Sequence, residues 1–83
     1  MKDYLASFYT HFGVLSFKAR LEANAALEIK QIATPRELSV ACGTALSFRL
    51  AKPLDFSELA DLDTEAIYEV IDGKYVVVFD QRN

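Results

Sequence analysis

The chain has 83 residues, 52% of them hydrophobic and 25% charged, and a formal net charge of −3. That length fits a single domain, 1–83, close to the smallest size that folds without covalent or metal staples. Phosphate binding needs a concentrated basic face, whereas the nine Lys and Arg are scattered along this chain, so we expect no nucleic-acid partner. No run approaches the roughly 18 apolar residues of a membrane span, and residues 1–8 lack a secretory signal. We therefore expect a soluble, cytoplasmic protein with no membrane partner.

The first elements are a strand and a helix. Residues 4–9 are aromatic and partly alternating, which predicts a buried strand. Apolar residues then recur at spacings of three and four, which predicts one face of a helix: Val14, Phe17, Leu21 and Ala25. Thr10 or His11 begins this helix, with Thr10 the better side-chain acceptor for its first amides. Three charged residues on its other sides are expected in solvent: Lys18, Arg20 and Glu22.

Two alternating segments and a short helix come next. Residues 27–32 alternate apolar and polar side chains, which predicts an edge strand with one buried face. Residues 44–50 alternate in the same way and predict a second strand. Pro53 ends that strand, and Asp55 or Ser57 opens a short helix. Its apolar residues are expected to be Phe56, Leu59 and Leu62.

The chain closes with a hairpin, because residues 65–71 and 74–79 read as strands joined through the tight turn Asp72-Gly73. The element order predicts an α+β fold, a small ferredoxin-like βαββαβ sandwich ending in an extra hairpin strand. Both helices then lie on one face of a mainly antiparallel sheet. A small βαβ sheet with a different strand order is the alternative. The last strand is apolar on both faces, so it is expected either in the sheet centre or buried in a homodimer.

The connection from Thr34 to Gly43 is the candidate site. It contains the only cysteine of the chain, Cys42, and it is longer than most strand connections, a feature typical of functional loops. In the predicted topology the first and second strands end, and the third begins, at one rim of the sheet. His11, Arg36 and Cys42 would gather there.

The loop has two alternative conformations with opposite consequences for the thiol. Thr34-Pro35-Arg36-Glu37 matches a helix start with a capping box, which would put Cys42 at the unfavourable end of the helix dipole. In the other conformation Ser39 caps a single turn and Cys42 lies near its start, where the dipole favours a thiolate. The second conformation leads directly into the next strand.

A free cysteine thiol is only about 3% thiolate at pH 7, and the thiolate is the reactive form. We predict that Arg36 stabilises this anion at Cys42, provided that the thiol is partly shielded. The alternative is a buried cysteine that only fills space, beside an ordinary solvated Arg36 and a surface His11. One Cys and one His are poor material for a metal site, and no dinucleotide or phosphate loop is present, so no metal or cofactor is expected.

The nine residues from Pro35 to Gly43 read Pro-Arg, two residues, Ser, two residues, Cys-Gly. This pattern resembles the signature of a small bacterial domain family of selenium/sulfur carrier-like proteins, and the likeness covers roughly residues 1–50. The Thr10-His11 turn before the first helix is similar as well, whereas Lys18 stands where the family has a glutamate.

The resemblance implies a carrier that holds sulfur or selenium on a persulfide or selenopersulfide of Cys42. Arg36 would stabilise the anion, Ser39 and the amide of Gly43 would donate hydrogen bonds, and Pro35 would set the approach of the loop. The implied partners are sulfur or selenium donor and acceptor proteins.

A carrier or accessory protein is therefore expected rather than a turnover enzyme, because no acid–base set beyond His11 is visible. The alternative is a non-catalytic protein-interaction or dimerisation module in which Cys42 is structural. A thiol-based redox sensor is a third interpretation.

Overall fold

The computed structural model describes residues 1–82 and contains the elements in the predicted order. The elements are β1 (Lys2–Phe8), α1 (His11–Ala23), β2 (Leu27–Ala33), β3 (Thr44–Leu50), α2 (Phe56–Leu59), β4 (Thr64–Ile71) and β5 (Lys74–Asp80). No helix in this described part is long and apolar enough to cross a membrane.

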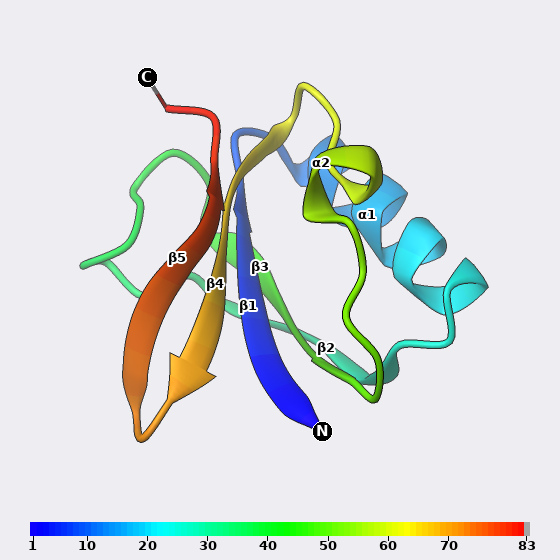
Figure 1. Cartoon of the computed structure of the whole chain (residues 1–83). Coiled ribbons are helices and arrows are strands. Elements are labelled where there is room, and N and C mark those ends of the chain that lie inside the picture. Colours follow the sequence, from blue (N-terminus) through cyan, green and yellow to red (C-terminus); the bar gives the residue numbers. More distant parts are fainter. Residues whose placement is uncertain (83) are drawn as a thin grey trace.

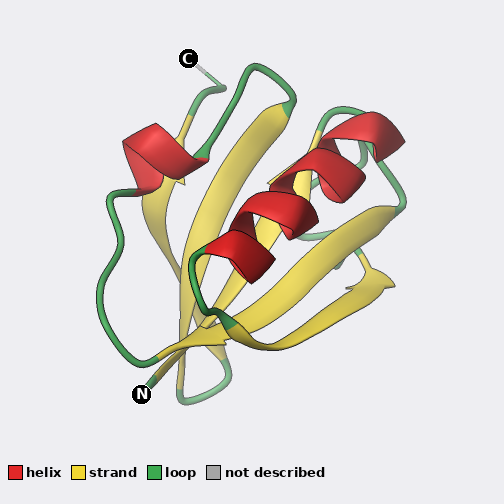
Figure 2. Cartoon of the chain, turned by 90° about the vertical axis from the view of Figure 1, so that its right-hand side faces the viewer, coloured by secondary structure: helices red, strands yellow, loops and turns green. Residues whose placement is uncertain are grey.

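The strands form one five-stranded sheet in the order β2-β3-β1-β4-β5, with every neighbouring pair antiparallel. Both helices lie on the same face of this sheet, on the right in Figure 1 and in front in Figure 2. The prediction of an α+β class with an antiparallel sheet is confirmed. β5 is an edge strand, so the prediction that it could be central is wrong.

The main core lies between the sheet and the helices. Because side chains alternate along a strand, β1 places Tyr4, Ala6 and Phe8 on this face, and all three are buried. Phe17 of α1 is fully buried, with its ring centroid 5.3 Å from that of Phe8 and 6.0 Å from that of Phe48. Large aromatic groups thus fix the helix on the sheet, as the apolar spacing of the sequence predicted.

The opposite face of the sheet carries no helix, and we call it the open face. Its centre is nevertheless buried: Leu5 and Tyr68 are each 2% exposed, and Ala45 and Ala66 are closed to solvent. Leu38, from the loop between β2 and β3, packs against this cluster. In Figure 1 that loop lies on the side of the sheet away from the helices. The candidate loop therefore supplies part of the cover of the open face.

Helix α1 begins as predicted and ends earlier than predicted. Thr10 is its N-cap, and its hydroxyl accepts the amide of Gly13 at 3.1 Å. The helix ends at Ala23, so Ala25 is outside it, exposed and with a φ of 59°. Arg20 was expected in solvent, and this is wrong because its side chain is drawn into a polar network with the segment before β4.

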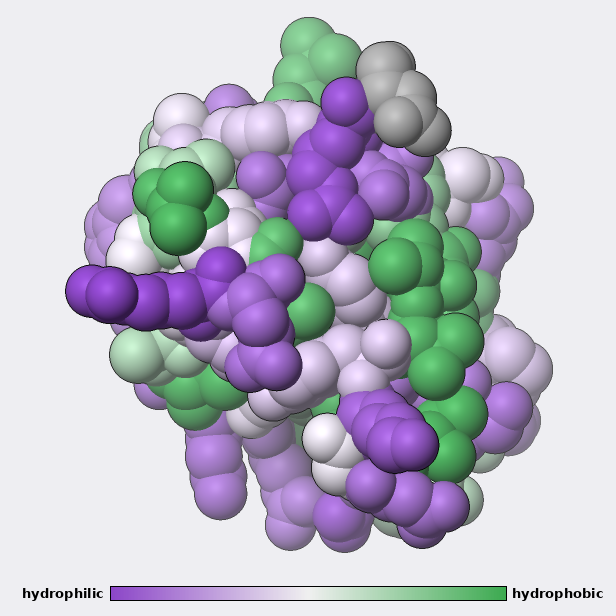
Figure 3. Space-filling view, turned by 90° about the vertical axis from the view of Figure 1, so that its left-hand side faces the viewer, coloured by the Kyte–Doolittle hydropathy of each residue, from purple (hydrophilic) through white to green (hydrophobic). Residues whose placement is uncertain are grey.

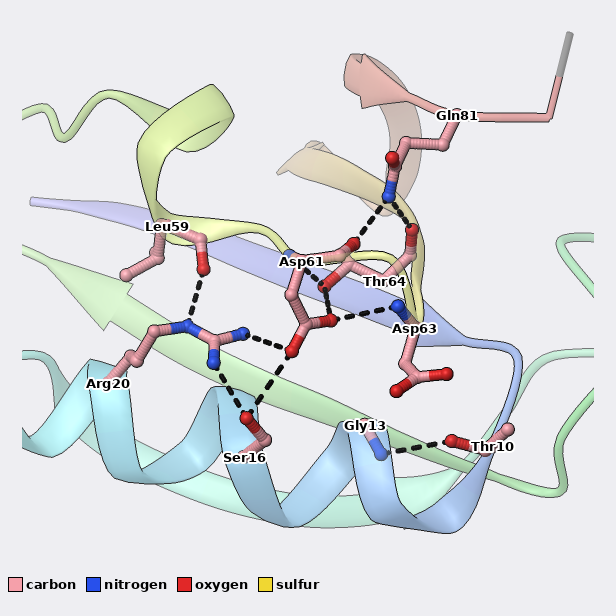
Figure 4. Close-up of polar contacts among 9 residues, drawn as sticks. All are labelled: Thr10, Gly13, Ser16, Arg20, Leu59, Asp61, Asp63, Thr64 and Gln81. Atoms are coloured by element: carbon pink, nitrogen blue, oxygen red, sulfur yellow. Dashed lines mark hydrogen bonds and ion pairs between the residues drawn. The ribbon is translucent and has the colours of Figure 1, made fainter.

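That network is centred on Asp61 (Figure 4). The Asp61 carboxylate accepts the Ser16 hydroxyl at 3.3 Å and forms an ion pair with Arg20 at 3.1 Å. Arg20 also donates from Nε to the carbonyl oxygen of Leu59 at 2.6 Å. These contacts connect α1 to the chain between α2 and β4. The sequence did not predict this connection, because the polar side of the helix was expected to lie in solvent.

Helix α2 is a single turn begun by Asp55, whose carboxylate accepts the amide of Ser57 at 3.0 Å. Leu59 is buried as predicted, whereas Leu62 lies outside the helix and is 88% exposed. The chain turns before reaching Leu62 because Ala60 is already extended, with a ψ of 153°.

The predicted hairpin is confirmed. Asp72 and Gly73 connect β4 to β5 with φ values of 51° and 76°, the left-handed pair that a type I′ turn requires. β5 is then held on one side only, and its valines Val76, Val77 and Val78 are 47%, 50% and 40% exposed.

Replacing Gly13 with alanine is expected to destabilise the fold by about 1–2 kcal/mol, although alanine normally favours a helix by about 1 kcal/mol over glycine. An added Cβ would lie 2.7 Å from the Cβ of Asp63 and 3.0 Å from its carbonyl oxygen. Asp63 cannot retreat easily, because its amide donates to Asp61 and its carbonyl accepts from Tyr9, both at 2.9 Å.

Denaturant midpoints of the Gly13→Ala variant measure this effect. Gly43→Ala is the matched control, since nothing lies within 4 Å of a Cβ there, and it is expected to change stability by less than about 0.5 kcal/mol. A gain in stability for Gly13→Ala would contradict the close approach of α1 to Asp63.

Candidate functional site

The segment Thr34–Gly43 is a loop closed at its base and turned once in its middle. The amide of Thr34 donates to the carbonyl oxygen of Gly43 at 3.1 Å, which closes the base. The carbonyl oxygen of Pro35 accepts the amides of Leu38 at 3.0 Å and Ser39 at 3.3 Å. A turn over residues 36–38 results. We call this segment the motif loop.

No helix forms within the motif loop. The interpretation of Thr34 as a helix start leading to Cys42 is therefore wrong. Ser39 does accept the amide of Ala41 at 3.1 Å through its hydroxyl, as a capping residue would, but bends follow it rather than a helical turn. A dipole needs aligned peptide units, so neither dipole argument applies to Cys42.

Cys42 lies half-buried at the wall of an open pocket of about 350 Å³. It packs against the core on the helix face of the sheet, while Leu38 packs against the cluster on the open face, so the motif loop straddles the sheet rim. Arg36 is exposed and lines the same pocket as Cys42. The cysteine is thus neither sealed in the core nor fully in solvent.

The structure brings most of the predicted site residues together. Ser39 and Gly43 line the Cys42 pocket with Arg36, whereas Pro35 supports the turn from just outside it. Thr10 is engaged as the cap of α1, and His11, the first residue of that helix, is exposed. Neither of them lines the pocket.

Two features of this region could not be found from the sequence. Thr34 lines the pocket, and among the residues that the structure describes its buried hydroxyl oxygen has no hydrogen-bond partner. Arg82 donates from Nη1 to the carbonyl oxygen of Leu38 at 3.0 Å. The sequence marks Thr34 as the start of the loop but does not show that its hydroxyl is buried. It does not show the contact of Arg82 either, because 44 residues separate the partners.

The residues that line this pocket include a cysteine, a threonine, a serine and an arginine. Within residues 1–82, no three His, Cys, Asp or Glu side chains are grouped in a way that could hold a metal ion. A thiol that shares a pocket with a cation and hydroxyl groups is of a type suited to holding a soft anion.

The fold and the motif loop define a small α+β domain whose single cysteine lies on a connection between strands. Residues 3–69 match the model of the family described as putative Se/S carrier protein-like, and the chain belongs to this family. The resemblance seen in the motif is confirmed, and it extends beyond residue 50 into β4. No curated protein and no solved structure matches the chain.

Proposed function

We propose that this protein is a sulfur or selenium carrier that binds the transferred atom covalently on Cys42 and passes it to a partner protein. One observation carries the proposal: the only cysteine of the chain, Cys42, lies in the motif loop, within the residues that match the carrier-like family. This half-buried cysteine lines a pocket together with Arg36, Thr34 and Ser39.

The proposed loading step conserves atoms and electrons. The Cys42 thiolate attacks the terminal sulfur of a persulfide on the donor protein, a new sulfur–sulfur bond forms, and the donor's own sulfur–sulfur bond breaks. The donor cysteine leaves as a thiolate, and Cys42 becomes the persulfide. Delivery is the same exchange in reverse, with an acceptor thiolate or another nucleophile as the attacking group. A selenium atom in the terminal position follows the same course.

The pocket supports each state of this cycle. Arg36 supplies positive charge for the thiolate before loading and for the terminal anion after it. The hydroxyl groups of Thr34 and Ser39 can donate hydrogen bonds to the added atom. Because the pocket is open, a partner cysteine can approach without the motif loop having to leave the sheet.

Three finer assignments belong to the same proposal. The strand order β2-β3-β1-β4, with both helices on one face, supports a ferredoxin-like fold to which β5 is added at the edge. A lone thiol stays reduced in the cytoplasm, so we place the reaction there. Donor and acceptor proteins are the proposed partners.

A second candidate function is an interaction or homodimerisation module in which Cys42 is structural. The valines of the β5 edge favour it, since Val76, Val77 and Val78 are 40–50% exposed on a strand with one side unpaired. Figure 3 shows hydrophobic side chains gathered in a column on the right of this side of the molecule, with smaller hydrophobic groups elsewhere among polar ones. Such a module keeps its partners when Cys42 is replaced, which separates it from a carrier.

Replacing Arg36 with glutamine is expected to slow alkylation of Cys42 at pH 7 by about three- to tenfold. One positive charge lining the same pocket is lost, and a nearby cation favours the reactive thiolate by roughly that factor. The measurement is the rate of labelling by a neutral alkylating reagent, followed by mass spectrometry of the intact chain.

Lys52→Gln is the matched control, because it removes the same charge from an exposed residue that does not line this pocket. Its labelling rate should equal that of the wild type. Equal rates in the wild type and Arg36→Gln would mean that Arg36 does not assist the thiol, and the proposed role of Arg36 would then be abandoned.

A further inference from the structure

The segment that follows β5 crosses back to the motif loop, and Arg82 makes the contact. Its guanidinium holds the Asp80 carboxylate with two parallel hydrogen bonds, Nε to Oδ1 and Nη2 to Oδ2, each 2.9 Å long. The amide of Arg82 also donates to the same carboxylate at 2.8 Å. A forked pair of this kind fixes the plane of the guanidinium. The orientation of Arg82 is thus set before it reaches the loop.

The third guanidinium nitrogen, Nη1, contacts the motif loop. Nη1 of Arg82 donates to the carbonyl oxygen of Leu38 at 3.0 Å, and its guanidinium carbon lies 5.9 Å from the centre of the Tyr68 ring. Tyr68 is 2% exposed and belongs to the cluster against which the Leu38 side chain packs. Arg82 therefore fastens the backbone of Leu38 at the place where its side chain covers the open face.

The electrostatic surroundings favour this arrangement. The hydrogen bonds from Arg82 hold the pKa of the Asp80 carboxyl below its usual value. The hydrogen bond to Asp80 and the negative charge of that carboxylate help to raise the pKa of Arg82. The Arg82 side chain is 34% exposed and that of Asp80 is 27% exposed, so water screens the pair only in part.

We propose that Arg82 is a positioning residue of the motif loop: it fastens the turn at Leu38 to the segment after β5 and thereby sets how far Cys42 is exposed. This inference rests on the proposed carrier function for its biological meaning. The loop is otherwise held by the Thr34–Gly43 hydrogen bond at its base and by the packing of Leu38. Cys42 itself packs against the core on the helix face. Within residues 1–82, releasing Arg82 leaves the turn at Leu38 with no hydrogen bond to the rest of the fold. The turn is then free to move, and the half-buried Cys42 beyond it becomes more exposed.

Amide hydrogen exchange tests the proposal directly. In the Arg82→Gln variant, the amides of Leu38, Ser39 and Ala41 are expected to exchange about tenfold faster, the loss that follows from removing one charged hydrogen bond. The amides of β1 at the sheet centre should keep their wild-type rates. Alkylation of Cys42 should become several-fold faster as the thiol opens.

Arg49→Gln is the matched control, because Arg49 pairs with Asp3 at 2.8 Å and Glu28 at 3.1 Å and makes no hydrogen bond to the motif loop within residues 1–82. It should leave exchange in the loop unchanged. Equal acceleration in Arg49→Gln, or wild-type exchange in Arg82→Gln, would overturn the assignment.

Arg82→Lys keeps the charge and removes the fork. Fast loop exchange in this variant, like that of Arg82→Gln, supports positioning by the fork, and wild-type exchange shows that charge alone suffices and overturns it. The lysine variant also decides the question should Arg82→Gln lose global stability. Exchange is measured without a sulfur donor, so failure of the carrier proposal and failure of the positioning proposal give different results.

Discussion

Replacement of Cys42 by serine is expected to abolish sulfur loading completely. Only the cysteine sulfur can form the sulfur–sulfur bond of a persulfide, because a serine hydroxyl is neither ionised at neutral pH nor a soft nucleophile. The chain has no second cysteine that could take over. The expected result is therefore an all-or-none difference rather than a reduced rate.

The experiment incubates the protein with a low-molecular-weight persulfide donor and measures the mass of the intact chain. The wild type should gain the mass of one sulfur atom, the gain should disappear on addition of a reducing agent, and Cys42→Ser should gain nothing. Since Cys42 packs against the core, the thermal midpoint of the variant must show that it is folded. Cys42→Ala is a second variant that keeps the packing apolar.

Two results would count against the carrier. One is a wild-type protein that gains no sulfur although its thiol alkylates normally. The other is a Cys42→Ser variant that retains every protein partner of the wild type, the behaviour expected of an interaction module. A protein that binds the sulfur-loaded wild type but not the unloaded wild type would instead be identified as an acceptor.

The strands were predictable because their signal is local. Alternation over residues 44–50 gave β3 with its observed bounds, since each side chain in turn faces the core or the open face. Asp72-Gly73 likewise predicted its hairpin, because only residues tolerant of positive φ fit that turn. The sequence also predicted the position of the long connection that forms the motif loop, because a strand pattern lies on each side of it.

The shape of the motif loop was not predictable, and the reason is physical. Its local pattern was compatible with a helix start at Thr34 and with a cap at Ser39, and these differ by little in intrinsic free energy. The outcome depends on distant contacts, namely the packing of Leu38 on the open face and the bond from Arg82 to its carbonyl oxygen. Neither contact has a signature near the loop.

The same limit explains the error at Arg20. A charged residue on the polar side of a helix is usually solvated, and its partner Asp61 is 41 residues further along the chain. The expectation that Leu62 belongs to a helix failed for a related reason, because the chain around Asp61 folds inward to meet Arg20 and Ser16 and leaves Leu62 exposed. Long-range polar contacts, not apolar periodicity, fix this part of the fold.

Replacement of Asp61 by alanine is accordingly expected to destabilise the protein by about 2–3 kcal/mol. The variant loses the ion pair with Arg20 and the hydrogen bonds from Ser16, Thr64 and the amide of Asp63. The estimate lies below that for a fully buried pair, because the side chains of Arg20 and Asp61 are 31% and 33% exposed. Urea denaturation measures the loss.

The pH dependence separates charge from packing. Burial alone would raise the pKa of the Asp61 carboxyl, but the hydrogen bond from the Asp63 amide and the charge of Arg20 more than offset it and lower the pKa. A carboxyl with a lowered pKa in the folded state adds stability above its unfolded pKa of about 3.9, and this stability is lost as the pH falls through the folded value. The stability difference between wild type and Asp61→Asn should therefore be largest at neutral pH and shrink below about pH 4. A difference that stays constant down to about pH 2 would assign the effect to shape rather than charge.

In either case Cys42 should still accept sulfur in the folded Asp61 variants, because the Asp61 network does not line the Cys42 pocket.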